Sequence, residues 1–242
     1  MSGRSPLSVI GFDADDTLWE NETHYRLTEV QFAGFLADFA EPEHLSERLL
    51  AAERRNLGYY GFGIKGFTLS MIETAIEVTN GRVPARVIQQ ILDAGRALHS
   101  HPTDLLPHAK ATIIRIAEQY RIILITKGDL FDQERKLAQS GLGDLFDAVE
   151  IVSDKTTETY RRIFAKHGEG TAIGMMVGNS LKSDVNPMIE AGGWGVHVPH
   201  ELVWAVEAAQ TPADTSRFRR IKTLATLPDL ITEIETRNGE ET

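Results

Sequence analysis

The chain has 242 residues, 42% of them hydrophobic and 25% charged, a composition typical of a folded globular protein with a core domain and room for a smaller one. Its net charge of −10 disfavours general nucleic-acid binding, since an acidic surface repels phosphates. The absence of cysteine excludes disulfides, thiolate catalysis and cysteine-ligated metal sites.

The amino-terminal segment makes a poor signal peptide, and no apolar run approaches the ~20 residues that cross a bilayer. We therefore expect a soluble, cytoplasmic protein without membrane or nucleic-acid partners, present as a monomer or homodimer.

The first hundred residues contain one expected strand and a long helical region. Residues 7–12 form an apolar run that ends at a carboxylate-rich turn, which is typical of a buried strand followed by a polar loop. Residues 21–100 carry apolar side chains at helical spacing. A Gly-rich aromatic segment, residues 59–66, is expected to be a loop between two of these helices.

From residue 103 onward, helical patterns alternate with short apolar runs. Strands are expected at 122–125, 147–152, 175–177 and 195–198, and the tail beyond residue 202 is mixed, with a weak helix near residue 230. Such alternation predicts an α/β fold, a Rossmann-like parallel sheet with helices on both faces. We expect residues 1–20 and 101–242 to form this core and residues 21–100 to form an inserted all-helical cap domain.

Polar residues follow four of the expected strands. The clusters are Asp13, Asp15 and Thr17; Thr126-Lys127-Gly128-Asp129; Ser153-Asp154-Lys155; and Gly178 through Asp184. Each cluster alone is explained by capping of the next helix. Because ligands of open parallel sheets bind at the carboxyl ends of the strands, the four together predict a site for a phosphate and a hard cation.

The residue types suggest a reaction. Mg²⁺ prefers oxygen ligands, which Asp13 and Asp184 supply, and together with Lys155 it would offset the repulsion between a carboxylate and a phosphate dianion. Asp13 can then attack phosphorus, and Asp15 can serve as general acid and later as general base. The expected phosphate-binding groups are Thr126, Thr17, Lys155 and the segments around Ala14, Lys127 and Gly128, whose backbone N–H groups face developing charge.

These residues resemble the motifs of the haloacid dehalogenase superfamily, specifically its phosphatase-like members. The first motif, D-x-D-x-T, is matched by Asp13 to Thr17, the second by Thr126, the third by Lys155 and the fourth by Gly178 to Asp184. The resemblance implies Asp13 as nucleophile and Asp15 as acid/base. It also implies Mg²⁺ held by the Asp13 carboxylate, the Asp15 carbonyl and the fourth motif, and a helical cap of the class that acts on small phosphorylated metabolites.

Two positions depart from the family pattern. Asn179 stands where an aspartate is common, which leaves Asp184 as the more direct metal ligand. Lys127 stands where asparagine usually follows the second-motif threonine, and it either contacts phosphate or points to solvent. In the segment 59–66, Lys65 either binds substrate or belongs to a packed loop between helices.

The sequence leaves other functions open. 2-Haloacid dehalogenation needs no metal and no acid at the position of Asp15, so Asp15 and Lys155 together with the acidic fourth motif argue against it. A phosphomutase would keep the same acid/base, and a non-catalytic protein that binds a phosphorylated ligand would keep only the fold.

Overall fold

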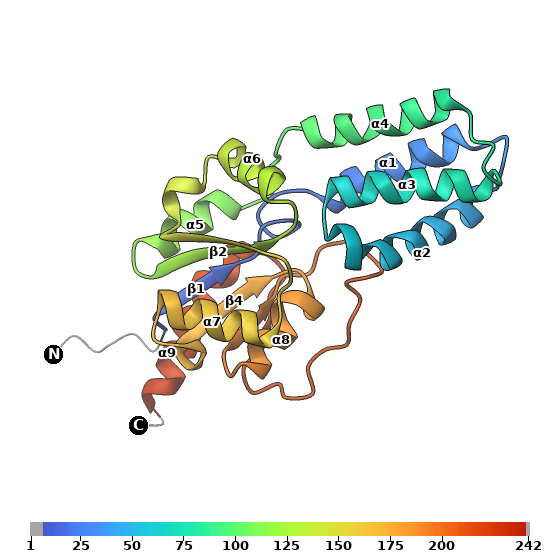
Figure 1. Ribbon diagram of the computed structural model, residues 1–242. Coiled ribbons are helices and arrows are strands. Elements are labelled where there is room, and N and C mark those ends of the chain that lie inside the picture. The colour runs from blue at the N-terminus through green and yellow to red at the C-terminus, as the bar shows by residue number, and fades with distance from the viewer. Residues whose placement is uncertain (1–6, 241–242) are drawn as a thin grey trace. The chain divides into compact units, whose positions relative to one another are not determined.

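The structure, a computed structural model, describes residues 7–240, with side chains described through residue 236. The chain divides into two compact units. The sheet unit contains the residues up to Glu20, Thr103–Lys127 and the residues from Leu137 onward; the helical unit contains Asn21–Pro102 and Gly128–Lys136. Figure 1 shows a sheet flanked by helices in the first and four long helices in the second.

Within residues 7–240, the sheet unit is built on six parallel strands in the order β3-β2-β1-β4-β5-β6. The strands are β1 (Val9–Phe12), β2 (Arg121–Lys127), β3 (Ala148–Val152), β4 (Gly174–Gly178), β5 (Trp194–His197) and β6 (Phe218–Arg220). The predicted α/β fold with a parallel sheet is thus confirmed. The first strand in the sequence, β1, lies between β2 and β4, where its carboxyl end has neighbours on both sides.

Successive side chains along the strands point to opposite faces of the sheet and pack into two hydrophobic cores, one on each face. Ile10 and Phe12 of β1 point into a core shared with α5 (Ala109–Ala117) and α9 (Leu227–Glu240). Val9 belongs to the opposite core, which α7 (Thr157–His167) and α8 (Asn186–Glu190) cover. The remaining helical segments are α6 (Leu130–Ser140), the single turns η1 (Gly143–Leu145), η2 (Thr171–Ile173) and η4 (Leu224–Thr226), and a π-helical turn, η3 (Leu181–Val185).

The helical unit confirms the helices predicted over residues 21–100. They are α1 (Glu22–Phe35), α2 (Pro42–Tyr60), α3 (Ile64–Val78) and α4 (Ala85–Ser100). Their apolar faces enclose a separate core that includes Phe32, Leu45, Met71 and Ile91. The unit also contains the start of α6, a segment that the sequence assigned to the core domain.

Two details of the sequence prediction were wrong. The segment 59–66 is mostly helical, because α2 runs to Tyr60 and α3 begins at Ile64. Only the short link between them is a loop, and its Gly61 and Gly63 have positive φ angles of 69° and 114°, a region that favours glycine. The sequence also missed β6, which adds a sixth strand beyond β5.

The chain leaves and re-enters the sheet unit through two segments that lie side by side. Glu20 N–H donates to the carbonyl of Asp104 at 2.9 Å, and Leu106 N–H donates to the carbonyl of Leu18, also at 2.9 Å. Trp19 and Leu105 form an antiparallel bridge between them. The long excursion through α1 to α4 therefore begins and ends at one hydrogen-bonded ribbon.

Candidate active site

The candidate site lies at the carboxyl edge of the sheet, around the end of β1. Phe12 pairs in register with Leu124 of β2 and Val177 of β4, so the residues that follow these three strands are neighbours. Asp13 N–H still donates to the carbonyl of Val177 at 2.9 Å. The backbone at Asp13 is thereby fixed to the sheet although the residue lies beyond the last one assigned to β1.

Lys155 connects two of the predicted carboxylates. Its ammonium donates to Oδ1 of Asp13 and, at 2.7 Å, to Oδ1 of Asp184. The side chains of Lys155 and Asp184 are each 1% exposed. The lysine comes just before α7, whose first turn is capped by the side chain of Thr156. Three clusters far apart in the sequence thus meet in one buried ion-pair network.

The second oxygen of Asp13 is held by Thr17. The Thr17 hydroxyl donates to Oδ2 of Asp13 at 2.9 Å and accepts from the backbone N–H of Asn179 at 3.0 Å. With Lys155 on Oδ1 and Thr17 on Oδ2, the carboxylate of Asp13 is fixed in rotation. Thr17 also brings the loop of Asn179 to within hydrogen-bond reach of the first cluster.

Asp184 is oriented by its own loop. Its Oδ2 accepts from the backbone N–H of Ser180 at 2.9 Å, while Oδ1 faces Lys155. A Cβ atom at Gly178 would lie only 2.2 Å from that Oδ2, so the end of β4 requires glycine here. The π-helical turn η3 carries Asp184 back toward the sheet edge, and such turns are frequent at functional sites.

The site holds more negative than positive charge. Burial of Asp13, together with the nearby charge of Asp184, raises the pKa of Asp13 from 3.8 to about 7 despite the opposing attraction of Lys155. Burial alone would lower the pKa of the Lys155 ammonium, but Asp13 and Asp184 outweigh it and raise that pKa above its usual value. The lysine stays protonated at neutral pH, and one ammonium incompletely compensates two carboxylates.

These donors fit a magnesium ion. Mg²⁺ takes oxygen ligands in proteins, usually one or two carboxylates with water and phosphate oxygens. Asp13 and Asp184 offer buried carboxylates, and the Asn179 side-chain oxygen lies 3.4 Å from the hydroxyl of Thr17, next to Asp13. Burial and, after it, the charge of Asp184 raise the pKa of Asp13, and a divalent cation would neutralise that charge.

Asp15 is held by Trp19, four residues further along the chain. Its Oδ1 accepts from the indole N–H of Trp19 at 2.7 Å, and Trp19 itself is fully buried. The two residues also form an isolated bridge, so a tight turn closes between them. The side chain is therefore anchored in this turn, where its charge acts on Asp13, and the residue as a whole is half-buried.

The residues of the second cluster, at the end of β2, differ in burial and in hydrogen-bond partners. Thr126 is buried near the end of β2, paired with Ile151 of β3. Lys127 does not point freely into solvent: its ammonium donates to Glu207 at 2.5 Å and to the hydroxyl of Ser183 at 2.7 Å. That the ammonium also binds phosphate stays a prediction.

The other predicted binding residues are placed as follows. Ala14 is buried, and its carbonyl accepts from Thr17 and Leu18 N–H groups in the turn after β1. Gly128 has a φ of 143°, a conformation that favours glycine. Lys65 belongs to the helical unit, where its ammonium donates to Asp129 of the same unit at 2.8 Å.

The sequence did not single out several residues that hold this site together. Trp19 follows Asp15 by four residues, a spacing within one turn that is a usable signal for such a contact. Tyr160 donates its hydroxyl to the carbonyl of Ser183 at 2.8 Å and supports η3 from α7. Glu207 comes from an irregular segment beyond β5, where no periodic pattern marks a side chain as buried.

Comparison with known proteins places this geometry in a family. The family model of haloacid dehalogenase-like hydrolases matches residues 7–192. No curated protein matches the chain. Among the described residues, no helix is both long and apolar enough to span a membrane.

Solved structures agree with the family model. A haloacid dehalogenase-like family hydrolase from Xanthomonas campestris is 40% identical, with a TM-score of 0.88 over 100% of this chain and 97% of that one. The HAD-hydrolase YfnB from Bacillus subtilis, bound to magnesium, has 15% identity and a TM-score of 0.64 over 93% and 98% of the two chains. L-2-haloacid dehalogenase from Xanthobacter autotrophicus has 18% identity and a TM-score of 0.65 over the same shares. The two distant structures share the fold.

A family model that spans most of the chain and a solved relative that covers all of it lead to one assignment: this chain belongs to the haloacid dehalogenase-like hydrolases and is a hydrolase.

Proposed function

We propose that the chain hydrolyses a small phosphate monoester through an aspartyl-phosphate on Asp13, with Mg²⁺ as cofactor. The observation that carries this proposal is the pair of buried carboxylates, Asp13 and Asp184, that share the single ammonium of Lys155. Such a site has charge left for a divalent cation, and a cation with a lysine is what a phosphate dianion needs to approach a carboxylate.

The proposed reaction has two steps, in which Asp13 is the nucleophile and Asp15 transfers the protons. An oxygen of Asp13 attacks phosphorus, and the bond between phosphorus and the ester oxygen breaks. The leaving alkoxide takes a proton from Asp15, which then removes a proton from water as that water attacks the aspartyl-phosphate. Inorganic phosphate leaves, and both carboxyl groups return to their starting protonation.

Asp13, Asp184 and Asn179 would hold the magnesium ion, together with the backbone carbonyl of Asp15. When bound, Mg²⁺ neutralises charge on the phosphate oxygens and the nucleophile. Lys155 keeps Asp13 and Asp184 at a fixed separation. The hydroxyl of Thr126, buried near the end of β2, would bind an oxygen of the transferring phosphoryl group.

Haloacid dehalogenation is the main rival, since a similar fold occurs in L-2-haloacid dehalogenase from Xanthobacter autotrophicus. That reaction needs an aspartate nucleophile but neither a metal nor a general acid at the place of Asp15. The excess negative charge around Asp13 and the anchored carboxylate of Asp15 favour phosphoryl transfer.

We also propose that the helical unit serves as the cap that selects the substrate. The chain enters it directly after the first cluster, through the ribbon of Trp19 and Leu105. Its short loop with Gly61 and Gly63 and its Lys65 would supply contacts to the part of the substrate that leaves.

The test is a phosphatase panel assayed with Mg²⁺ and with a chelator, beside a halide-release assay on 2-haloacids. We expect phosphate release that needs Mg²⁺ and is abolished by Asp13→Asn, while Asp15→Asn slows it. Phosphate release that persists after chelation and in Asp13→Asn contradicts the mechanism. Halide release without metal would instead favour the dehalogenase, and transfer of phosphate to a sugar hydroxyl would favour a phosphomutase.

A further inference from the structure

An irregular segment between β5 and β6 lies against the fourth cluster. Residues 206–210 of this segment, here named the strap, are tied down at three points. Lys182 of η3 donates to the carbonyl of Val206 at 2.7 Å, and Asn186 of α8 donates to the carbonyl of Gln210 at 3.1 Å. The third point is Glu207, whose side chain is only 12% exposed.

Glu207 accepts hydrogen bonds from two catalytic clusters at once. Its Oε1 accepts from the ammonium of Lys127 at 2.5 Å, and its Oε2 accepts from the hydroxyls of Ser180 at 2.7 Å and Ser183 at 2.5 Å. Lys127 also donates to Ser183 at 2.7 Å, which closes the network. Residues from the end of β2, from η3 and from the strap therefore meet at one carboxylate.

Two partners of Glu207 are linked to proposed catalytic groups, one through the chain and one through a hydrogen bond. Lys127 follows Thr126 in the chain, and the N–H of Ser180 holds Oδ2 of Asp184 at 2.9 Å. Any movement of Glu207 would reach Asp184 through Ser180 and Thr126 through Lys127. Small displacements matter here, because a misplacement of about 1 Å can reduce a rate roughly 100-fold.

The network is charged. Burial alone would raise the pKa of Glu207, but the charge of Lys127 and the hydrogen bonds from Lys127, Ser183 and Ser180 outweigh it and lower the pKa. The side chain of Lys127 is 14% exposed. A largely buried ion pair with additional hydrogen bonds is costly to break, since loss of one partner leaves the other charge unpaired.

We propose that Lys127 and Glu207 form a positioning pair, in which Glu207 fixes the loops of Thr126 and Asp184 relative to each other. This inference rests on the proposed function, because it gives the pair a role in that reaction. It also explains why a lysine is useful after Thr126: the ammonium spans the gap between β2 and the strap. Neither residue touches the reacting atoms in this role.

Three variants test the pair. Glu207→Gln keeps the shape and removes the charge, Lys127→Met removes the ammonium, and the double variant Lys127→Glu with Glu207→Lys exchanges the charges. Serine hydroxyls both donate and accept, so the exchanged pair can keep its links to Ser180 and Ser183. For each single variant we expect kcat to fall roughly 10- to 100-fold, as for other residues that orient active-site ligands, with KM nearly unchanged. The exchange should recover much of kcat.

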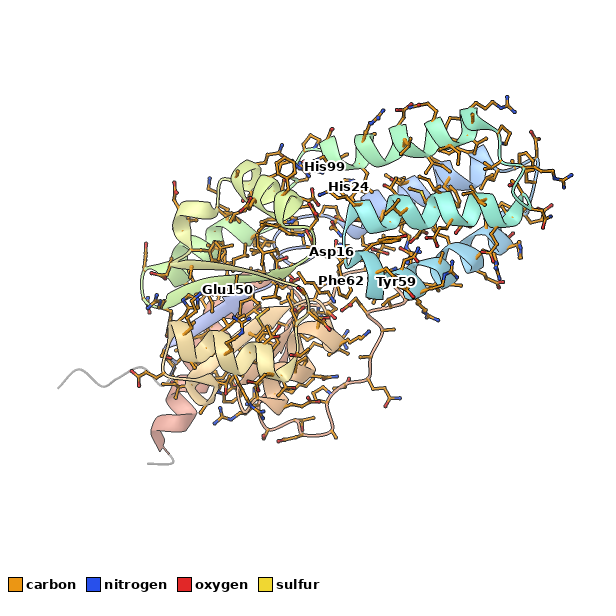
Figure 2. All side chains as sticks on the ribbon, in the orientation of Figure 1. Asp16, His24, Tyr59, Phe62, His99 and Glu150 are labelled. Carbon is orange, nitrogen blue, oxygen red and sulfur yellow. The ribbon has the colours of Figure 1, made fainter. Side chains whose placement is uncertain are left out.

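A second readout does not depend on activity. Hydrogen exchange followed by mass spectrometry should show faster exchange in residues 178–185 for Glu207→Gln. Lys166→Met is the control for loss of a lysine elsewhere in the sheet unit, because Lys166 donates to Glu150 of β3 at 2.7 Å in a more exposed ion pair. Figure 2 shows Glu150 well away from Asp16, which marks the loop after β1. The control should leave both kcat and the exchange of residues 178–185 as in the wild type.

The outcomes separate this inference from the proposed function. If both single variants keep kcat within twofold and exchange at residues 178–185 is unchanged, the positioning role is overturned. An exchange of charges that restores neither quantity also overturns it. A wild-type chain that hydrolyses no phosphate ester refutes the proposed function, and hydrogen exchange then decides the role of the pair alone.

Discussion

Replacing Lys155 by methionine should destabilise the sheet unit strongly. Methionine has similar length but no charge, so the change removes one ammonium and little volume. In the wild type this ammonium contacts Asp13 and lies 2.7 Å from Oδ1 of Asp184. The variant would leave two carboxylates facing each other at a site where the Asp184 side chain is 1% exposed.

The size of the effect follows from this burial. Removing one partner of a buried ion pair costs about 3–5 kcal/mol, whereas an exposed pair contributes about 0–1 kcal/mol. Asp13 already has a pKa of about 7, so it can take up a proton once Lys155 is gone and limit the loss. We therefore expect the lower end, about 3 kcal/mol at pH 7.

Tryptophan fluorescence during urea unfolding measures this loss for the right part of the chain. All three tryptophans, Trp19, Trp194 and Trp204, belong to the sheet unit. The experiment is performed with a chelator present, so that no cation replaces the ammonium. Lys166→Met serves as the control for loss of a lysine at an exposed pair.

A double variant tests whether unpaired charge causes the loss of stability. Adding Asp184→Asn to Lys155→Met removes one of the two unpaired charges, so the double variant should be more stable than the single one. A loss below about 1 kcal/mol for Lys155→Met, no greater than for Lys166→Met, would refute the view that this ammonium compensates a buried excess of charge.

Three further predictions concern separate parts of the sheet unit. Gly178→Ala should cost about 1–3 kcal/mol in urea unfolding and lower kcat, because its Cβ would lie 2.2 Å from Oδ2 of Asp184; unchanged kcat and stability would contradict this packing. Trp19→Phe removes the indole donor of the proposed general acid and should lower kcat roughly 10- to 100-fold with little change in KM, which steady-state kinetics would disprove by showing wild-type turnover. Burial alone would raise the pKa of Glu150, but hydrogen bonds from His167 and a lysine outweigh it and lower that pKa below 4.5. The stabilisation is therefore present above pH 4.5 and lost as pH falls through the lower folded-state pKa, so the wild type and Glu150→Gln should converge in urea midpoint on acidification; a constant difference would speak against the assignment.

The sequence predicted the sheet and the meeting of the clusters for one physical reason. Strands covered on both faces are continuous apolar runs, and in a parallel sheet all carboxyl ends lie at one edge. The contacts of Lys155 with Asp13 and Asp184 are the result. Thr17 was grouped with Asp13 from the motif, and its hydroxyl does bind that carboxylate.

The features that the sequence did not predict are not marked by apolar runs or by helical spacing. The strand β6 (Phe218–Arg220) is short, at the edge of the sheet and partly exposed, so it has no apolar run. Glu207 reaches the site from an irregular segment, where burial of a side chain depends on tertiary contacts alone. Gly66 suggested a loop by composition, yet α3 includes it because Ile64 and Phe67 are buried on one helical face.

The ribbon of Trp19 and Leu105 has a consequence for how such proteins can diversify. The segments around Trp19 and Leu105 are hydrogen-bonded to each other inside the sheet unit. The two ends of the intervening chain are therefore held side by side. An insert of another length or shape would join the sheet unit at the same two ends, because these ends are paired by their own hydrogen bonds. With the proposed role of the helical unit in substrate selection, exchange of the insert would change selectivity while the surroundings of Asp13 stay as they are.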